Sequence, residues 1–164
     1  MKRTFFEHKS DKAERNQLIY SFLSTHPIGV LASVDPNGNP HAAVVYFSVD
    51  KNFVIMFTTK NETKKNDNIK HNKHVMLICY ESASQTTVQI IGSVNEITDV
   101  EKLERIFAGT MLASMQTSDS GIPPIAKLHA GNYVGFVLYP KSIAMSVYGQ
   151  SNKDTYESFE IDDF

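Results

Sequence analysis

The chain lacks tryptophan and has a single cysteine, Cys79, among its 164 residues. One cysteine cannot form an internal disulfide, which is typical of a reducing compartment. Cys79 lies inside the apolar run VMLICY, so we expect a buried structural thiol rather than a nucleophile. No apolar run reaches the roughly 20 residues that span a bilayer, and the N-terminal MKRTFFEHKSDKAER has no signal-peptide stretch. We therefore expect a soluble cytoplasmic protein without a membrane partner.

The motifs of several enzyme classes are missing as well. There is no GxSxG elbow, no GxxxxGK[ST] phosphate loop and no GxGxxG turn. Only His71 and His74 are close together among the six histidines, and the local sequence shows no third ligand, so no metal site is expected. No residue stands out as a catalytic acid or base.

Neither sign of charge dominates the chain, whose formal net charge is -2. This balance argues against a disordered chain and against nucleic acid as a partner. The charge is uneven, because positions 60–73 hold five lysines and the last eleven residues are strongly acidic. We expect a solvated basic face and a frayed acidic tail over about 150–164. The length fits one domain, residues 1–164.

The pattern of apolar residues predicts two long helices. The first covers about residues 11–24, with Asp11 and Glu14 as a capping-box-like pair. The second is opened by Thr98 and Glu101 as a capping box and continues to about residue 115. Pro123 and its neighbour favour an irregular connection over 116–131.

Strand patterns fill most of the remaining chain. Apolar and β-branched runs predict strands at 28–34, 41–49, 53–58, 75–80, 86–97, 133–139 and 142–148. The hexapeptide DPNGNP predicts a tight turn, Gly92 a bulge or bend, and Pro140 with Lys141 a further turn. The fold class is therefore mainly β, a small barrel of six to seven antiparallel strands with flanking helices.

The stretch 53–73 has an unusual charge pattern. A buried strand leads through two threonines into a short helix, capped by Asn61 or Thr59 and continuing through Ile69. Lys64 and Lys65 fall in its first turns, where the macrodipole disfavours cations. With a phosphate bound there, the two lysines would instead be favourable. Exposed lysines on a polar link remain an alternative, and an RNA-binding patch is a weaker one, because positions 58–74 lack stacking aromatics.

The block from Gly29 to Ile97 resembles the FMN-binding split-barrel family related to pyridoxamine 5′-phosphate oxidase, including its general-stress-protein branch. The motifs that carry the resemblance are, in chain order, Phe57-Thr58-Thr59, Thr63-Lys64-Lys65, Asn72-Lys73-His74-Val75 and the strand Val88 to Val94 with its Gly92. The block that carries the resemblance covers somewhat under half of the chain.

The resemblance implies a split β-barrel that binds FMN at the interface of a homodimer. By position, Lys64 and Lys65 would hold the FMN phosphate, with hydroxyls from Thr59, Thr58 and Thr63. The strand residues Val44, Val45, Tyr46 and Phe47 would line the flavin ring, and Gln85 or Thr87 would donate to it. Stacking would fall to Tyr46, Phe47, Tyr148 or a partner's aromatic residue.

The activity implied is that of an FMN-dependent oxidoreductase acting on a small molecule, with NAD(P)H as a candidate electron donor. The final strands, YVGFVLYPKSIAMSVYGQ, lack the family's Arg-x-His substrate motif, so pyridoxamine phosphate oxidation itself is not expected. The alternatives are a non-catalytic flavin-binding stress module and a split barrel that takes haem or deazaflavin instead.

Overall fold

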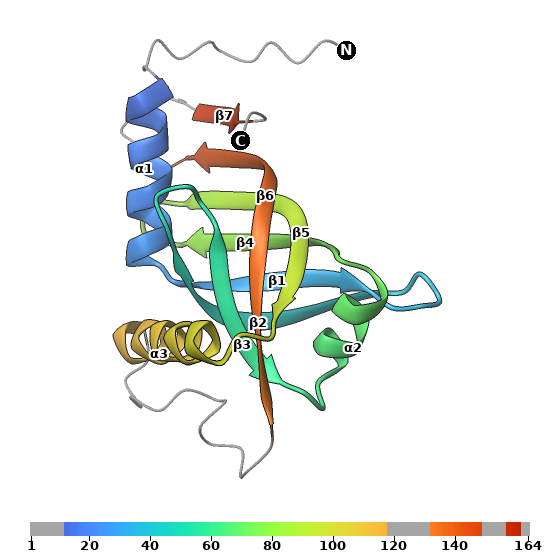
Figure 1. The fold of residues 1–164 in the computed structure, drawn as a ribbon. Coiled ribbons are helices and arrows are strands. Elements are labelled where there is room, and N and C mark those ends of the chain that lie inside the picture. Colours follow the sequence, from blue (N-terminus) through green and yellow to red (C-terminus); the bar gives the residue numbers. More distant parts are fainter. Residues whose placement is uncertain (1–11, 118–131, 149–156, 162–164) are drawn as a thin grey trace.

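The computed structural model describes residues 12–117, 132–148 and 157–161 (Figure 1). Its three helices are α1 (Lys12–Thr25), α2 (Lys64–His71) and α3 (Val100–Thr117). Its seven strands are β1 (Ile28–Val34), β2 (Pro40–Val49), β3 (Ile55–Lys60), β4 (His74–Glu81), β5 (Thr86–Ile97), β6 (Tyr133–Val147) and β7 (Glu157–Ile161).

The strands form one antiparallel sheet that closes on itself. Their order is β3-β2-β1-β4-β5-β6-β7, and a further pairing of β3 with β6 closes the first six into a barrel. β7 adds to the free side of β6. The predicted mainly-β barrel with flanking helices is therefore confirmed.

The barrel is open along part of one seam. β2 pairs with β3 only over Phe47–Val49, opposite Ile55–Phe57. The stretch 40–46 of β2 pairs with β1 and has no strand partner on its other side among the described residues. We call this stretch the split edge.

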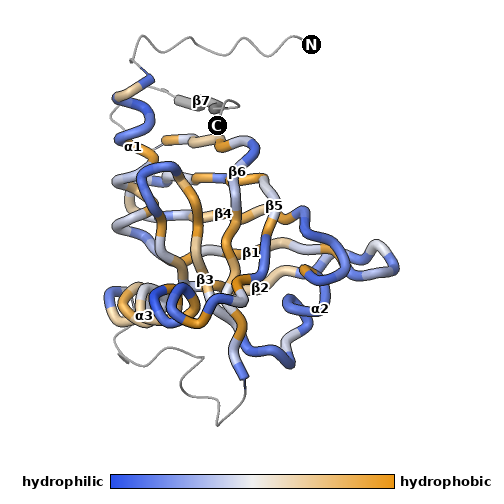
Figure 2. Tube along the Cα trace, in the orientation of Figure 1, coloured by the Kyte–Doolittle hydropathy of each residue, from blue (hydrophilic) through white to orange (hydrophobic). Residues whose placement is uncertain are grey.

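Side chains on the inner face of the strands fill the barrel. The largest of them, Phe47, Phe57 and Phe136, are fully buried, and the rings of Phe57 and Phe136 lie 5.5 Å apart. In Figure 1, α1 and α2 lie at opposite ends of the barrel, while α3 runs outside β2 and β3. Figure 2 shows that α2 is almost wholly hydrophilic, apart from Ile69, which is 2% exposed.

Gly92 marks a β-bulge, as predicted, but the turn predicted at Pro140 and Lys141 is wrong. β6 continues through both residues as one strand. Ile91 lies opposite Ser142 and Gly92 opposite Pro140, so Lys141 is the extra residue of the bulge. A proline in a strand is tolerated at such a bulge because no ladder hydrogen bond is needed there.

The N-terminal end of α3 also differs from the prediction. The carboxylate of Asp99 accepts a hydrogen bond from the Lys102 N–H at 2.8 Å, so Asp99 and not Thr98 caps this helix. Both residue types are good caps, and helix ends commonly vary by one residue. Some predicted features lie outside the described residues. They are the cap at Asp11, most of the irregular connection (118–131) and the residues that follow Tyr148 (149–156).

The acidic tail is not frayed throughout. Residues Glu157–Ile161 form β7, which pairs with Ile143–Val147 of β6. The last four residues of ESFEI alternate polar and apolar, a pattern typical of a strand. The strand was not predicted, because the acidic residues of this stretch are more typical of an exposed tail.

Cys79 is buried, as predicted, and burial raises the pKa of its thiol to about 12. We expect native protein at pH 8 to react negligibly with a thiol reagent such as DTNB, because the thiolate is the reactive species. Addition of urea should release one equivalent. Rapid stoichiometric labelling of the native protein would contradict the burial.

No helix in the part of the chain that the structure describes combines the length and apolarity needed to cross a membrane. No cluster of three or more His, Cys, Asp or Glu side chains in this part of the chain is placed to hold a metal ion.

Candidate functional site

The predicted site begins where β3 ends. The strand covers Ile55–Lys60 rather than 53–58, because Phe53 has a left-handed φ of 61° within the turn after Asp50. The Asp50 carboxylate accepts hydrogen bonds from the N–H groups of Asn52 and Val54, which fixes that turn. The shift places Thr58 and Thr59 near the end of the strand.

Thr63, and not Asn61 or Thr59, is the N-cap of α2. Its backbone is extended (φ −92°, ψ 143°), and its Oγ1 accepts a hydrogen bond from the Asn66 N–H at 3.4 Å. The Asn61 side chain instead accepts from Asn66 Nδ2 and from Lys70 Nζ. Because β3 extends to Lys60, the helix begins later than the sequence pattern predicted.

Three side chains meet between β3 and α2. Lys65 Nζ donates to Thr59 Oγ1 at 2.9 Å, and Thr59 Oγ1 lies 3.1 Å from Thr63 Oγ1. Thr63 Oγ1 donates its own proton to the Lys60 carbonyl at 2.9 Å, so Thr59 is the donor between the two hydroxyls. We call Thr59, Thr63, Lys64 and Lys65 the α2 corner.

The α2 corner is rich in donors. Lys65 is half-buried, desolvation lowers the pKa of its ammonium group, and Thr59 is its hydrogen-bond partner. No carboxylate of the described residues pairs with it. The first N–H groups of α2, at Lys64 and Lys65, have no backbone acceptor in the described chain. Together with the positive end of the helix macrodipole, this arrangement suits an anion.

Lys64 is exposed beside this group. It faces the turn between β1 and β2, where its charge helps to lower the pKa of Asp35, although hydrogen bonds from Asn39 are the larger cause. The exposed ammonium is therefore free to turn towards a ligand.

The split edge of β2 lies near the α2 corner, because α2 packs against the ends of β1 and β2. Phe47 donates its N–H to the Pro27 carbonyl on the β1 side. Backbone groups alternate in direction along a strand, so those of Val44 and Tyr46 point to the unpaired side. The side chains of Val45 and Phe47 point into the core and are 3% and 0% exposed.

Thr58 lies on the other face of β3 from Thr59, since neighbouring side chains alternate. Its hydroxyl is buried and has no hydrogen-bond partner. The structure thus brings Thr59, Thr63 and Lys65 together but directs the Thr58 side chain elsewhere.

Gln85 and Thr87 lie at the opposite end of the barrel. β4 starts beside α2 and runs away from it for eight residues, about 25 Å. The loop that follows is fixed by the Glu81 carboxylate, whose pKa falls to about 2 because Ser84 and the Ala83 N–H donate to it. Within one chain these two residues do not meet the α2 corner.

Two asparagines that the sequence analysis did not single out position α2. Asn68 Nδ2 donates to Ser33 Oγ of β1 at 3.1 Å, and both residues are buried. Asn66 Nδ2 donates to the Asn61 carbonyl at 2.7 Å. The sequence feature that could have identified them is their position near Ile69, the one apolar residue of α2. They hold the N-terminus of α2 against the barrel.

Comparison with known proteins gives the family. The family model described as pyridoxamine 5′-phosphate oxidase matches residues 16–129, well over half of the chain. The chain belongs to the pyridoxamine 5′-phosphate oxidase family. No curated protein matches the sequence at a significant level.

Several solved structures share this fold. A pyridoxamine 5′-phosphate oxidase-related, FMN-binding protein from Nostoc punctiforme is 15% identical (TM-score 0.53, 91% of this chain and 94% of that one). A protein related to general stress protein 26 from Clostridium acetobutylicum is 16% identical (TM-score 0.58, 92% and 94%). A haem-binding protein from Mycobacterium smegmatis is 14% identical (TM-score 0.58, 93% and 59%). At these identities the likeness concerns the fold.

Proposed function

We propose that this chain binds FMN and acts as an FMN-dependent oxidoreductase on a small molecule. The observation that carries the proposal is the half-buried ammonium group of Lys65, which has a hydroxyl partner but no carboxylate in the described chain. A buried cation is costly without an anion. The FMN phosphate would supply one, and the family has an FMN-binding relative.

In this proposal the α2 corner holds the phosphate. Lys65 and Lys64 donate as ammonium groups, Thr59 turns its hydroxyl to the phosphate, and the free N–H groups of α2 complete the donor set. Thr63 remains the helix cap. Asn68, held by Ser33, keeps this arrangement rigid.

The flavin ring would then lie along the split edge, where the unpaired backbone groups of Val44 and Tyr46 can bind its polar edge. When bound, FMN supplies hydride or electron transfer, and the protein positions the ring and excludes water. Because the chain lacks the Arg-x-His motif, the proposed substrate is a small molecule other than pyridoxamine phosphate.

A visible spectrum of purified protein tests the proposal. Bound flavin gives a yellow protein, and added FMN should lose fluorescence as it binds. A colourless protein that binds no added FMN would overturn the proposal. A haem-binding split barrel is the alternative, favoured by the fold of the Mycobacterium smegmatis protein, and a Soret band after haem addition would distinguish it.

The affinity for FMN should depend on pH in a defined direction. Burial lowers the pKa of Lys65 from its ordinary 10.5, whereas the phosphate needs this group charged. FMN affinity should therefore be full at pH 7 and fall as pH rises through the lowered pKa. Apo protein should show the reverse trend, gaining stability between the lowered pKa and 10.5, because its unfolded state binds more protons there.

Fluorescence titrations from pH 7 to 10.5 measure this dependence. The Lys65→Met variant is the control, because its FMN affinity should fall much less as the pH rises. An FMN affinity that rises with pH in the wild-type protein would contradict the role of Lys65.

We also propose that two copies of the chain form a homodimer. The outer face of the sheet exposes apolar side chains on β1, β2, β4 and β5: Val30, Val44, Tyr80 and Ile91. On this face, Val30 lies between Val44 and Ile78 on the neighbouring strands. A second copy would cover this face. Leu112 and Met115 of α3 add exposed apolar surface.

Val30→Arg is expected to convert the dimer into a monomer, because a charge would enter the centre of the apolar face. Size-exclusion chromatography with light scattering measures the mass. Val100→Arg is the matched control, since Val100 is more exposed but lies at the start of α3. A wild-type protein of monomer mass would contradict the dimer.

A further inference from the structure

Two tight turns of the chain share one backbone geometry: the β1–β2 turn that begins at Asp35 and the β2–β3 turn that begins at Asp50. In each, the aspartate carboxylate accepts hydrogen bonds of 2.8–2.9 Å from the N–H groups two and four residues later. In each, the fourth residue has a left-handed φ, 84° at Gly38 and 61° at Phe53. Its N–H donates to the carbonyl of the aspartate at 3.0 Å. The two turns therefore form a matched pair that differs in its side chains.

An asparagine occupies the third position of both turns, and both Asn37 and Asn52 are exposed. The residue that follows each asparagine differs. Phe53 is 4% exposed and belongs to the core, so packing holds its backbone. Gly38 is exposed, and nothing lies within 4 Å of the position that a Cβ atom would take. The backbone nitrogen that follows Asn37 is therefore much more accessible to the asparagine side chain than the one that follows Asn52.

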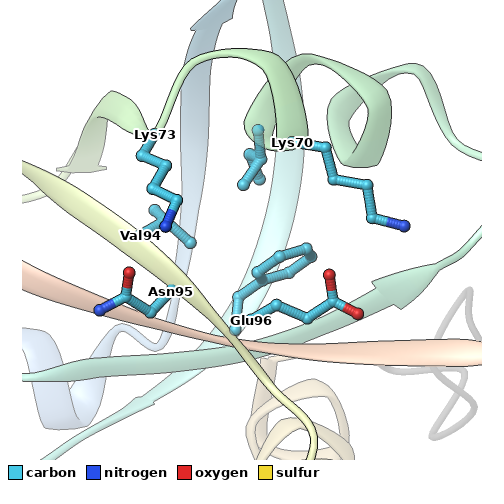
Figure 3. A pocket seen from close by; sticks show the side chains of 7 residues that line it. Lys70, Lys73, Val94, Asn95 and Glu96 are labelled. Atoms are coloured by element: carbon cyan, nitrogen blue, oxygen red, sulfur yellow. The ribbon is translucent and has the colours of Figure 1, made fainter.

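Asn37 is also set apart from other exposed asparagines. Its side chain has no hydrogen-bond partner among the described residues, and it belongs to the only Asn-Gly pair of the sequence. Asn39 donates two hydrogen bonds to the carboxylate that opens the turn, and it precedes Pro40, which has no N–H. Asn95 lies beside the cavity near the C-terminal end of α2 (Figure 3), but it is held in the ladder of β5 and β6 and precedes Glu96.

We propose that Asn37 is a site of spontaneous covalent modification, at which the asparagine converts to aspartate and isoaspartate through a succinimide. In the first step the Gly38 nitrogen bonds to the Asn37 Cγ, the Cγ–Nδ2 bond breaks, and ammonia leaves with the proton of the Gly38 N–H. In the second step one water molecule opens the ring at either of its two carbonyls. Nothing is oxidised or reduced. The site is distinct from the FMN site and does not depend on it.

The β1–β2 turn itself restrains the reaction. In the closed turn the Gly38 N–H donates to the Asp35 carbonyl, so the nitrogen is free to attack only after this bond opens. The Asp35 carboxylate holds the turn closed, because it binds the N–H groups of Asn37 and Asn39. Exposed turns open locally at little cost in free energy. The reaction therefore proceeds from the locally open turn of the otherwise folded protein.

Isoaspartate changes the main chain as well as the charge. Its backbone runs through the former side-chain carboxyl group, so one additional carbon enters the turn. The hydrogen bond between the Asp35 N–H and the Asn39 carbonyl, 3.0 Å long, requires the ordinary chain length. The isoaspartate protein should therefore melt at a lower temperature than Asn37→Asp, which carries the same charge on an ordinary backbone. Equal melting temperatures would contradict this change in the turn.

Peptide mapping of the full chain tests the proposal, after incubation at mildly alkaline pH. Trypsin cleavage after Lys51 places Asn37 and Asn52 in different peptides, and fragment ions locate the change within each. We expect Asn37 to gain about 1 Da and to give two products, of which an isoaspartyl methyltransferase methylates one. Asn52 should stay unchanged over the same time and is the internal control. No mass gain at Asn37, or an equal gain at Asn52, would overturn the proposal.

Three variants test the mechanism. Gly38→Ala should abolish most of the mass gain, because a Cβ atom restricts the backbone and hinders the attack. Asp35→Ala should speed the reaction about tenfold, the effect of losing one or two net hydrogen bonds that hold the turn closed. Asp50→Ala removes the equivalent bonds from the other turn and should leave the rate at Asn37 unchanged. A Gly38→Ala protein that reacts like wild type would contradict the attack by this nitrogen, and equal rates in the two aspartate variants would contradict local opening.

Discussion

Lys65→Met is expected to weaken FMN binding by between about 10- and 100-fold, the range for loss of one charge-assisted hydrogen bond to a phosphate. Lys65 is the one residue of the α2 corner whose ammonium group is both half-buried and fixed, by its bond to Thr59. Its position is already ordered, so little conformational entropy is lost when the ligand binds.

The same substitution should leave folding stability unchanged or slightly increased. Methionine fills a similar volume, and the cost of burying a cation disappears. A loss of FMN affinity at constant thermal midpoint would therefore identify Lys65 as a ligand-binding residue rather than a structural one.

Lys70→Met is the matched control, because it removes the same charge from the other end of the same helix. It should change FMN affinity less than threefold, roughly the effect of a screened surface charge. If both variants bind FMN like the wild-type protein, the phosphate is held elsewhere. If both weaken it equally, the effect is one of overall charge.

Gly92→Ala is expected to destabilise the fold by about 3 kcal/mol or more. A Cβ atom at this position would collide with the Tyr139 carbonyl oxygen and lie 2.9 Å from Leu138 Cδ1. The collision is with backbone of β6, opposite the bulge, so rotation of a side chain cannot relieve it. The ladder of β5 and β6 would have to open.

For a chain of this length, such a change lowers the thermal midpoint by about 10 °C. Gly38→Ala is the control. Its φ is 84° and nothing lies within 4 Å of the added Cβ, so its cost is that of the backbone alone, about 1 kcal/mol. Circular dichroism melts measure both, and a Gly92→Ala protein as stable as Gly38→Ala would contradict the close approach.

Local sequence signals predicted much of this fold. Apolar alternation predicted both ends of β5 to the residue, and Gly92 indicated the bulge between β5 and β6. The prediction of a turn at Pro140 was wrong because proline occurs both at turns and at bulges. The partner strand decides which one forms, and partner strands lie far apart in the sequence.

The site shows the same division between local and long-range information. Thr59, Thr63 and Lys65 lie within seven residues, so a strand followed by a helix is enough to bring them together. The split edge depends on where β3 leaves β2 for β6, which no local pattern records. Gln85 lies at the other end of the barrel because β4 runs away from α2.

Parallel titrations of the wild-type protein with FMN and riboflavin test the central claim most directly, because the two ligands differ only in the phosphate. The account predicts that FMN binds about 100-fold more tightly or better, since several charged and polar donors meet the phosphate. In the Lys64→Met/Lys65→Met protein the difference should shrink to about tenfold or less. Equal affinities of the wild-type protein for FMN and riboflavin would contradict a phosphate site at the α2 corner.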